Sequence, residues 1–173
     1  WLLGACSWIS LAAQELKIDK ETKTISIPAK VALRKLPDLA EIYPLEVVCT
    51  SAKGEKKHET VVTSETKPSE IHKALESLGL KPGKPAKGED AKAEGPETEI
   101  YLEISKPNAP PERIAIEKLM VDRKTGKPLP KLKWLFTGSV QKQPDPDKPD
   151  KVYGADFTGT LISIFPVTED TVL

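Results

Sequence analysis

Apolar residues recur along the chain with two spacings, and the first is the alternation typical of β-strands. In residues 16–31, "LKIDKETKTISIPAKV", apolar and polar positions alternate on both sides of Lys20–Lys23, which predicts two short strands around a turn. The β-rich runs "LEVVCT" and "HETVVT" flank the polar loop "SAKGEKK", and together they predict a β-hairpin. In its first strand, alternation puts Leu45, Val47 and Cys49 on one face.

The second spacing is helical and occurs in "KPSEIHKALESLGL". Its apolar positions recur at intervals of three and four and form one stripe: Ile71, Ala74, Leu75 and Leu78. Pro68 suits the first turn of a helix, and Gly79 suits the residue just past its end. Leu80 can then fold back on Leu75, as in a Schellman cap. The pattern predicts a well-defined amphipathic helix over about residues 68–78.

The second half of the chain consists of short apolar runs between proline-rich segments. Strands are predicted in "EIYLEI", "RIAIEKLMVD" and "KWLFTGSV", followed by a terminal hairpin in "VYGADFTGTLISIF" that turns between Asp156 and Gly159. Segments near 81–97 and 141–150 are rich in Lys, Pro and Gly, and predict flexible surface loops. Eight or nine short strands with one helix indicate the α+β class, with a mainly antiparallel sheet, in a single domain over residues 14–173.

The first residues have a different composition from the rest. "WLLGACSWISLAAQ" has no charged residue, whereas charges recur every few positions from Glu15 onward. The segment is too short for a membrane-spanning helix, and Ser10–Ala12 fits the small-x-small rule for signal peptidase. We therefore expect residues 1–13 to be the remnant of a secretory signal, and the mature chain to be exported to the periplasm or cell envelope without a transmembrane span. Two alternatives stay open: lipidation at Cys6 after a "LGAC" lipobox, and a genuine N-terminal helix.

Charge and cysteine content restrict the possible partners. The 26 Lys and Arg residues are balanced by 26 Asp and Glu residues, which argues against a nucleic-acid partner because such partners require a concentrated positive field. If the signal is removed, Cys49 is the remaining cysteine, so it has no partner for an internal disulfide. Its position in a β-rich run indicates a small buried apolar residue.

Both histidines lie in residues 57–83, where a metal site has to be considered. His58 and Glu59 are consecutive in the predicted strand, so their side chains are expected on opposite faces. If the predicted helix runs back along the predicted strand, the rise per residue of each element gives the distance of each histidine from the connection between them. These two distances differ by about 10 Å, which separates His58 from His72. We therefore expect no metal, with these two histidines as weak candidate ligands. Ser139–Lys142 matches S-x-x-K and Lys124–Gly126 matches K-T-G, two motifs of penicillin-recognising enzymes. We attribute both to chance, because their order is reversed, the middle motif is absent and Ser139 follows a predicted strand instead of starting a helix.

Several blocks resemble one known family. "KHETVVTSETKPSEIHKALESLGLKPG", together with "WLFTGS" and "ADFTGTLISIF", is similar to the YdjY-type domain over Leu16–Leu173. The resemblance implies an exported bacterial protein of unknown function, and the Lys- and Pro-rich style is similar to planctomycete-like versions with a Gram-negative-type periplasm. Some relatives are labelled ferredoxin-like because they carry cysteine motifs. An iron–sulfur cluster needs four cysteines, so that label does not transfer and we expect no cofactor.

These observations favour a non-catalytic domain that binds a partner protein or small ligand in the envelope, as a monomer or weak oligomer. The expected contact surface contains Lys57, His58, Glu59, His72 and Trp134. One alternative is a metal-dependent or acid–base enzyme that uses the two histidines with Glu59, Asp122 or Asp156. Another is a structural envelope protein anchored through a lipid on Cys6.

Overall fold

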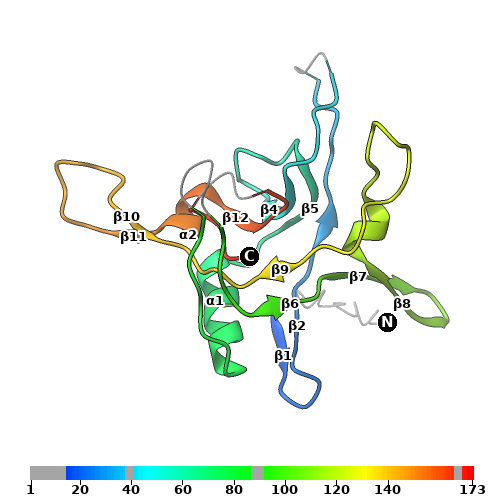
Figure 1. Cartoon of the computed structure of the whole chain (residues 1–173), viewed down its shortest axis with the longest axis horizontal. Helices are drawn as coiled ribbons and strands as arrows, with labels where there is room; N and C mark the ends of the chain where they lie inside the picture. Colours follow the sequence, from blue (N-terminus) through cyan, green and yellow to red (C-terminus); the bar gives the residue numbers. More distant parts are fainter. Residues whose placement is uncertain (1–14, 38–40, 87–91, 166–168) are drawn as a thin grey trace, which may run out of the picture.

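The computed structural model describes residues 15–37, 41–86, 92–165 and 169–173, and short strands dominate them (Figure 1). The helices are α1 (Pro68–Ser77), the 3-10 helix η1 (Ile116–Leu119) and α2 (Gly154–Thr158). The strands are β1 (Lys17–Asp19), β2 (Thr24–Ser26), β3 (Lys30–Val31), β4 (Val47–Ser51), β5 (Thr60–Ser64), β6 (Glu97–Thr98), β7 (Tyr101–Lys106), β8 (Ala109–Ala115), β9 (Trp134–Leu135), β10 (Gln141–Lys142), β11 (Val152–Tyr153) and β12 (Thr160–Ser163). The predicted α+β class is confirmed. The expected signal segment and Cys6 lie outside the described residues.

A four-stranded sheet in the order β12-β4-β5-β3 forms the centre of the fold. β12 and β3 pair antiparallel with their neighbours, whereas β4 and β5 run parallel. The predicted hairpin of "LEVVCT" and "HETVVT" is therefore wrong. Residues 52–59 return alongside the sheet, and the carbonyl of Glu59 accepts the N–H groups of Glu46 and Val47, so that β5 starts beside the start of β4.

Burial along β4 agrees with its central place. Val47, Val48, Cys49 and Thr50 are all buried, so both faces of this strand are covered rather than the one face that alternation predicted. Burial also raises the pKa of the Cys49 thiol to about 12. The prediction of a buried, apolar role for this cysteine is confirmed.

Helix α1 forms over the residues that local signals predicted. Pro68 occupies its first turn, and Ile71, Ala74 and Leu75 are buried. The N–H of Leu80 donates to the carbonyl of Leu75, and the N–H of Gly79 to that of Glu76, which is the Schellman arrangement. Gly79 has φ of +87°, a backbone conformation that favours glycine.

Four two-stranded sheets surround the centre: β1–β2, β6–β9, β7–β8 and β10–β11. The β1–β2 hairpin is the predicted one. Two predicted strands are shorter than expected, because the run over 113–122 leaves β8 at Ala115 and turns into η1, and the run over 133–140 is extended only in β9. The β10–β11 hairpin extends away from the centre (Figure 1).

The predicted terminal hairpin is also wrong. β11 pairs with β10, whereas β12, which follows α2 in the chain, pairs with β4. The segment between β11 and β12 forms the short helix α2, and the N–H of Gly159 donates to the carbonyl of Ala155 at 2.8 Å at its end. Gly159 has φ of +76°, so its predicted turn role is realised as the end of α2.

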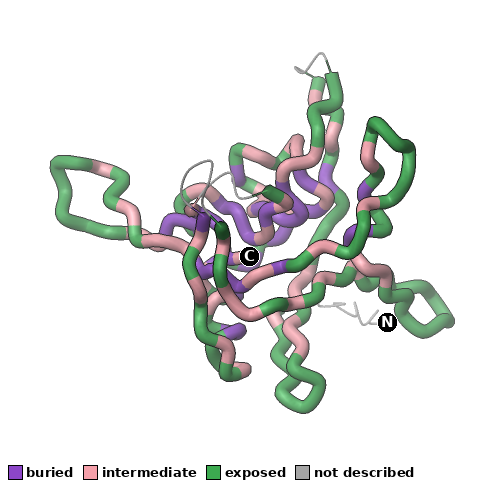
Figure 2. Tube along the Cα trace, in the orientation of Figure 1, coloured by how far each residue is buried: buried purple, intermediate pink, exposed green. Residues whose placement is uncertain are grey.

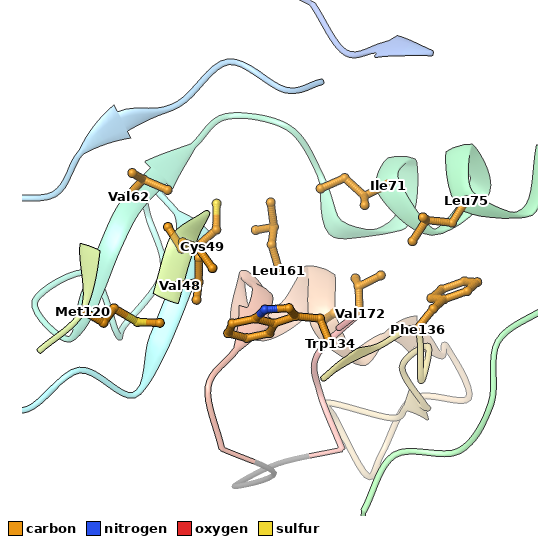
Figure 3. Packing of buried hydrophobic residues seen from close by; sticks show 12 residues of the cluster. Val48, Cys49, Val62, Ile71, Leu75, Met120, Trp134, Phe136, Leu161 and Val172 are labelled. Carbon is orange, nitrogen blue, oxygen red and sulfur yellow. The ribbon is translucent and has the colours of Figure 1, made fainter. Parts of the chain in front are cut away.

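The core lies between α1, the central sheet and the segment around β9. In Figure 3, Ile71 and Leu75 of α1 approach Val172 and Phe136, and Trp134 lies near Leu161. Figure 2 shows that burial is concentrated in this centre, whereas the projecting hairpins are exposed along most of their length. A functional site is therefore to be sought on the surfaces that surround this small core.

Candidate functional site

His58 lies in the turn before β5 rather than in the strand itself. Its Nε2 is 3.5 Å from Oε1 of Glu59, and its ring meets that of Tyr43 edge-on at 5.5 Å. The expectation that His58 and Glu59 point to opposite faces was therefore wrong, because β5 begins only at Thr60. Lys57, which was also expected in the contact surface, is exposed.

His72 is enclosed between two aromatic rings on one side of α1. Its ring meets Phe136 at 5.1 Å and Tyr153 at 5.3 Å between centroids, both edge-on. Nδ1 lies 2.8 Å from the Tyr153 hydroxyl, and Nε2 lies 3.5 Å from Oε1 of Glu76, one helical turn further on. Only 18% of the His72 side chain is exposed, so this residue of the expected contact surface lies mostly inside the fold.

Two hydrogen bonds meet at the Tyr153 hydroxyl. The backbone N–H of Ser139 donates to its oxygen at 3.0 Å, and Nδ1 of His72 lies 2.8 Å from it in a hydrogen bond whose direction follows the imidazole tautomer. Burial raises the pKa of Tyr153 to about 12, although the N–H of Ser139 acts in the opposite direction, so the phenol is protonated near neutral pH.

The Ser139 hydroxyl connects elements of the fold and is not paired with a base. The Ser139 hydroxyl donates to the carbonyl of Glu169 at 3.2 Å and accepts the N–H of Ala155 at 2.9 Å. Its contact with Tyr153 is made through the backbone N–H, so the Ser139 hydroxyl itself is not directed at His72. The network holds α1, the segment around Ser139 and the start of α2 together.

The carboxylates considered for an acid–base enzyme have other structural roles. Asp122 accepts the N–H of Lys124 at 2.8 Å within its own turn. Asp156 accepts the N–H of Ser69 at 2.8 Å, at the start of α1, where an anion complements the helix dipole. Within the described ranges, no group of three or more His, Cys, Asp or Glu residues is placed to hold a metal ion.

Trp134 is buried, with 4% of the residue exposed, and a buried carboxylate holds its indole. Oε1 of Glu117 accepts the indole N–H at 2.8 Å and the N–H of Leu132 at 3.3 Å. Burial alone would raise the pKa of Glu117, but hydrogen bonds from its own N–H, from Trp134 and from Leu132 together lower it. The sequence pattern had no signal for Glu117, because its partner lies 17 positions away.

Trp134 also helps to line a groove of about 180 Å³. The groove runs between the β9 segment and the end of β12, and its apolar lining includes Leu132, Trp134, Leu135, Ile164, Phe165 and Leu173. Phe165 remains 54% exposed at its rim. Of these residues only Trp134 was expected in a contact surface. A weak signal for Ile164 and Phe165 was the run "ISIF", which is more apolar than an exposed strand end requires.

The arrangement defines an α+β domain with an aromatic groove and an internal histidine–tyrosine network. The YdjY domain model matches residues 16–172, and the chain therefore belongs to the YdjY domain family, as its sequence blocks predicted. Comparison with curated proteins and with solved structures gives no match. Among the described residues, no helix is both long and apolar enough to cross a membrane.

Proposed function

We propose that this chain is an exported, non-catalytic binding domain of the cell envelope, and that a partner protein contacts it at the groove beside Trp134. The observation that carries the proposal is the groove itself, a mostly apolar surface on which Phe165 is half exposed and which the buried Trp134 helps to line. Aromatic residues in such pockets contribute much of the free energy of binding in protein interfaces.

The size of the groove favours a partner protein over an enclosed small ligand. Its volume of about 180 Å³ is below the roughly 300–1,000 Å³ of pockets that bury a drug-sized molecule. A space of this size admits an apolar side chain presented by a larger surface. The rim includes Lys133, Thr137 and Ser163, which supply polar atoms around the apolar centre, as at the edge of a protein interface.

Preorganisation of Trp134 also supports binding. The hydrogen bond to Glu117 and the burial of the indole leave it no rotational freedom to lose when a partner docks. Binding surfaces that are rigid before association lose less conformational entropy and bind more tightly for the same contact area.

Site-specific photocrosslinking in the cells that make the protein tests the groove. A photoreactive phenylalanine analogue at position 165 is expected to form an adduct with one envelope protein, and Phe165→Ser is expected to abolish co-purification of that protein. The matched control is Phe157 on α2, which is 64% exposed and does not line the groove. Equal adducts from both positions, or none from position 165, would contradict the proposal.

Export is tested separately by the mature N-terminus. Cell fractionation followed by mass spectrometry is expected to find the chain in the envelope fraction, starting near Ala13. A lipid-modified Cys6 at the N-terminus would instead identify the anchored alternative. An intact chain in the cytoplasmic fraction would contradict export.

A further inference from the structure

β3 is an open edge of the central sheet. In the order β12-β4-β5-β3 it has β5 on one side and no described strand on the other. The opposite edge is covered, because the N–H of Ser163 in β12 donates to the carbonyl of Leu173, and Val172 donates back to Leu161. Within the described part of the chain, the sheet thus has one edge available for a further strand.

The pairing register shows which backbone groups face outward. Lys30 lies opposite Thr63 and Val31 opposite Val62, and the N–H of Ala32 donates to the carbonyl of Val61 at 3.0 Å. Inward and outward hydrogen bonding alternate along an antiparallel strand, so the N–H and C=O groups of Val31 point away from β5. They present a donor and an acceptor at the free edge.

Side chains along this edge are unusually exposed for their type. Val31 is 78% exposed and Leu33 79%, whereas Ala32 between them is only 8% exposed. Val31 and Leu33 therefore lie together on the solvent side of the strand and its extension. The same stretch belongs to the projecting segment that is exposed along much of its length at the top of Figure 2.

All charged side chains along this edge are cationic. Residues 29–37, "AKVALRKLP", contain Lys30, Arg34 and Lys35 and no acidic residue. Arg34 donates to the neutral carbonyl of Tyr43, and none of the three cations forms an ion pair with a described residue. Cations on an edge strand discourage pairing with a second copy, because antiparallel pairing would bring like charges together. The same cations attract a segment of opposite charge.

We propose that the β3 edge accepts an extended, acidic segment of a partner chain as an added strand. Backbone hydrogen bonds at Val31 hold the segment, apolar side chains on it contact Val31 and Leu33, and its carboxylates pair with the cations at positions 30, 34 and 35. This surface is separate from the groove beside Trp134, and either can operate without the other.

Val31→Pro is the decisive variant, because proline removes the outward N–H of residue 31, which makes no bond to β5, and so spares the hydrogen bonds between β3 and β5. It removes the valine side chain as well, so both proposed contacts of residue 31 are tested together. Peptides selected from a displayed random library against the wild-type chain provide the probe. We expect peptides with apolar residues at alternate positions and acidic residues between them. Their affinity should fall at least about tenfold on Val31→Pro, and also on Lys30→Glu with Arg34→Glu. Binding should weaken as salt rises.

The control is Val121→Pro, at a residue 56% exposed elsewhere on the chain, with unfolding measured for every variant. Selected peptides that bind Val31→Pro as tightly as wild type, or that carry no acidic residues, would overturn the proposal. A wild-type dimer in sedimentation that becomes monomeric on Val31→Pro would also overturn it, by identifying a second copy as the occupant. Photocrosslinking at Phe165 is unaffected by these results, so the two surfaces fail or succeed independently.

Discussion

The hydroxyl of Tyr153 lies 2.8 Å from Nδ1 of His72, although the two residues are 81 positions apart. The contact joins α1 to the end of β11. Because the same hydroxyl accepts the N–H of Ser139, one oxygen fixes the positions of three segments. The histidine is thereby part of the internal support of the fold, with its Nε2 directed at Glu76 on the outside of α1.

Replacement of Tyr153 by Phe should destabilise the chain. The substitution removes the oxygen shared by His72 and Ser139 and leaves two partly buried polar groups without a partner, which costs about 2 kcal/mol. Urea unfolding measures the change. Tyr101→Phe is the control, since that hydroxyl bonds Glu99 at the surface and its loss should change stability by less than about 0.5 kcal/mol. Equal effects of both substitutions would argue against a supporting role for the network.

Gly138 allows the chain to approach His72 closely. It has φ of +67°, and a Cβ there would lie 2.8 Å from Cβ of Pro82 and 3.1 Å from Cε1 of His72. Gly126 also has φ of +67° but has nothing within 4 Å of such a Cβ. Gly126→Ala should therefore cost the left-handed backbone term alone, about 1 kcal/mol.

Gly138→Ala should cost a further 1–3 kcal/mol, roughly, from overpacking against Pro82 and His72. Thermal or urea unfolding of the two variants side by side isolates the packing contribution. An equal loss of stability in both would show that the contact with His72 relaxes without cost.

Glu117 should make stability depend on acidity. Its pKa is lowered in the folded chain from an ordinary value of 4.5. Its ionised form therefore stabilises the fold above that value, and the contribution is lost as pH falls through the lower, folded-state pKa. Wild type should lose more stability than Glu117→Gln between about pH 6 and pH 3. Glu103→Gln, at an exposed position on β7, should retain the wild-type slope. A slope for Glu117→Gln that matches wild type would exclude this role.

Cys49 should be inert in the folded chain. It is 2% exposed, and burial raises the pKa of its thiol to about 12, so both access and thiolate formation are suppressed. Alkylation followed by peptide mapping should find Cys49 unmodified without denaturant and modified in step with unfolding. Modification of Cys49 under native conditions, at the rate of a free thiol, would require an opening of the sheet near β4.

Local signals were sufficient for α1 and for the β1–β2 hairpin. In α1, the proline at its start, the apolar stripe and Gly79 at its end all lie within one short stretch, so each constrains the same element. The β4 and β5 runs show the limit of such reasoning. A polar loop with a glycine suits either a hairpin or a short return connection. The choice between them depends on the other strands of the sheet: β12 pairs with β4, and β3 pairs with β5.

The candidate site was predictable to a smaller degree. Trp134 and His72 were both expected in a contact surface, and the structure buries Trp134 and leaves only 18% of the His72 side chain exposed. The groove itself was not visible in the sequence, because its walls come from residues 85–86, 93, 132–135, 137, 163–165, 171 and 173, which only the tertiary fold brings together. The close approach of His58 to Glu59 was missed because the strand was assumed to begin at His58, and a turn obeys no alternation.

By itself, the sequence determined the family of the chain, its α+β class, the bounds of its main helix and the buried character of Cys49, because these depend on composition and on spacing within a few residues. Tertiary structure decided the parallel pairing of β4 and β5, the partner of His72, the setting of Trp134 against Glu117 and the openness of the β3 edge. Each of these depends on contacts between residues distant along the chain, and such contacts form only when the whole core packs at once.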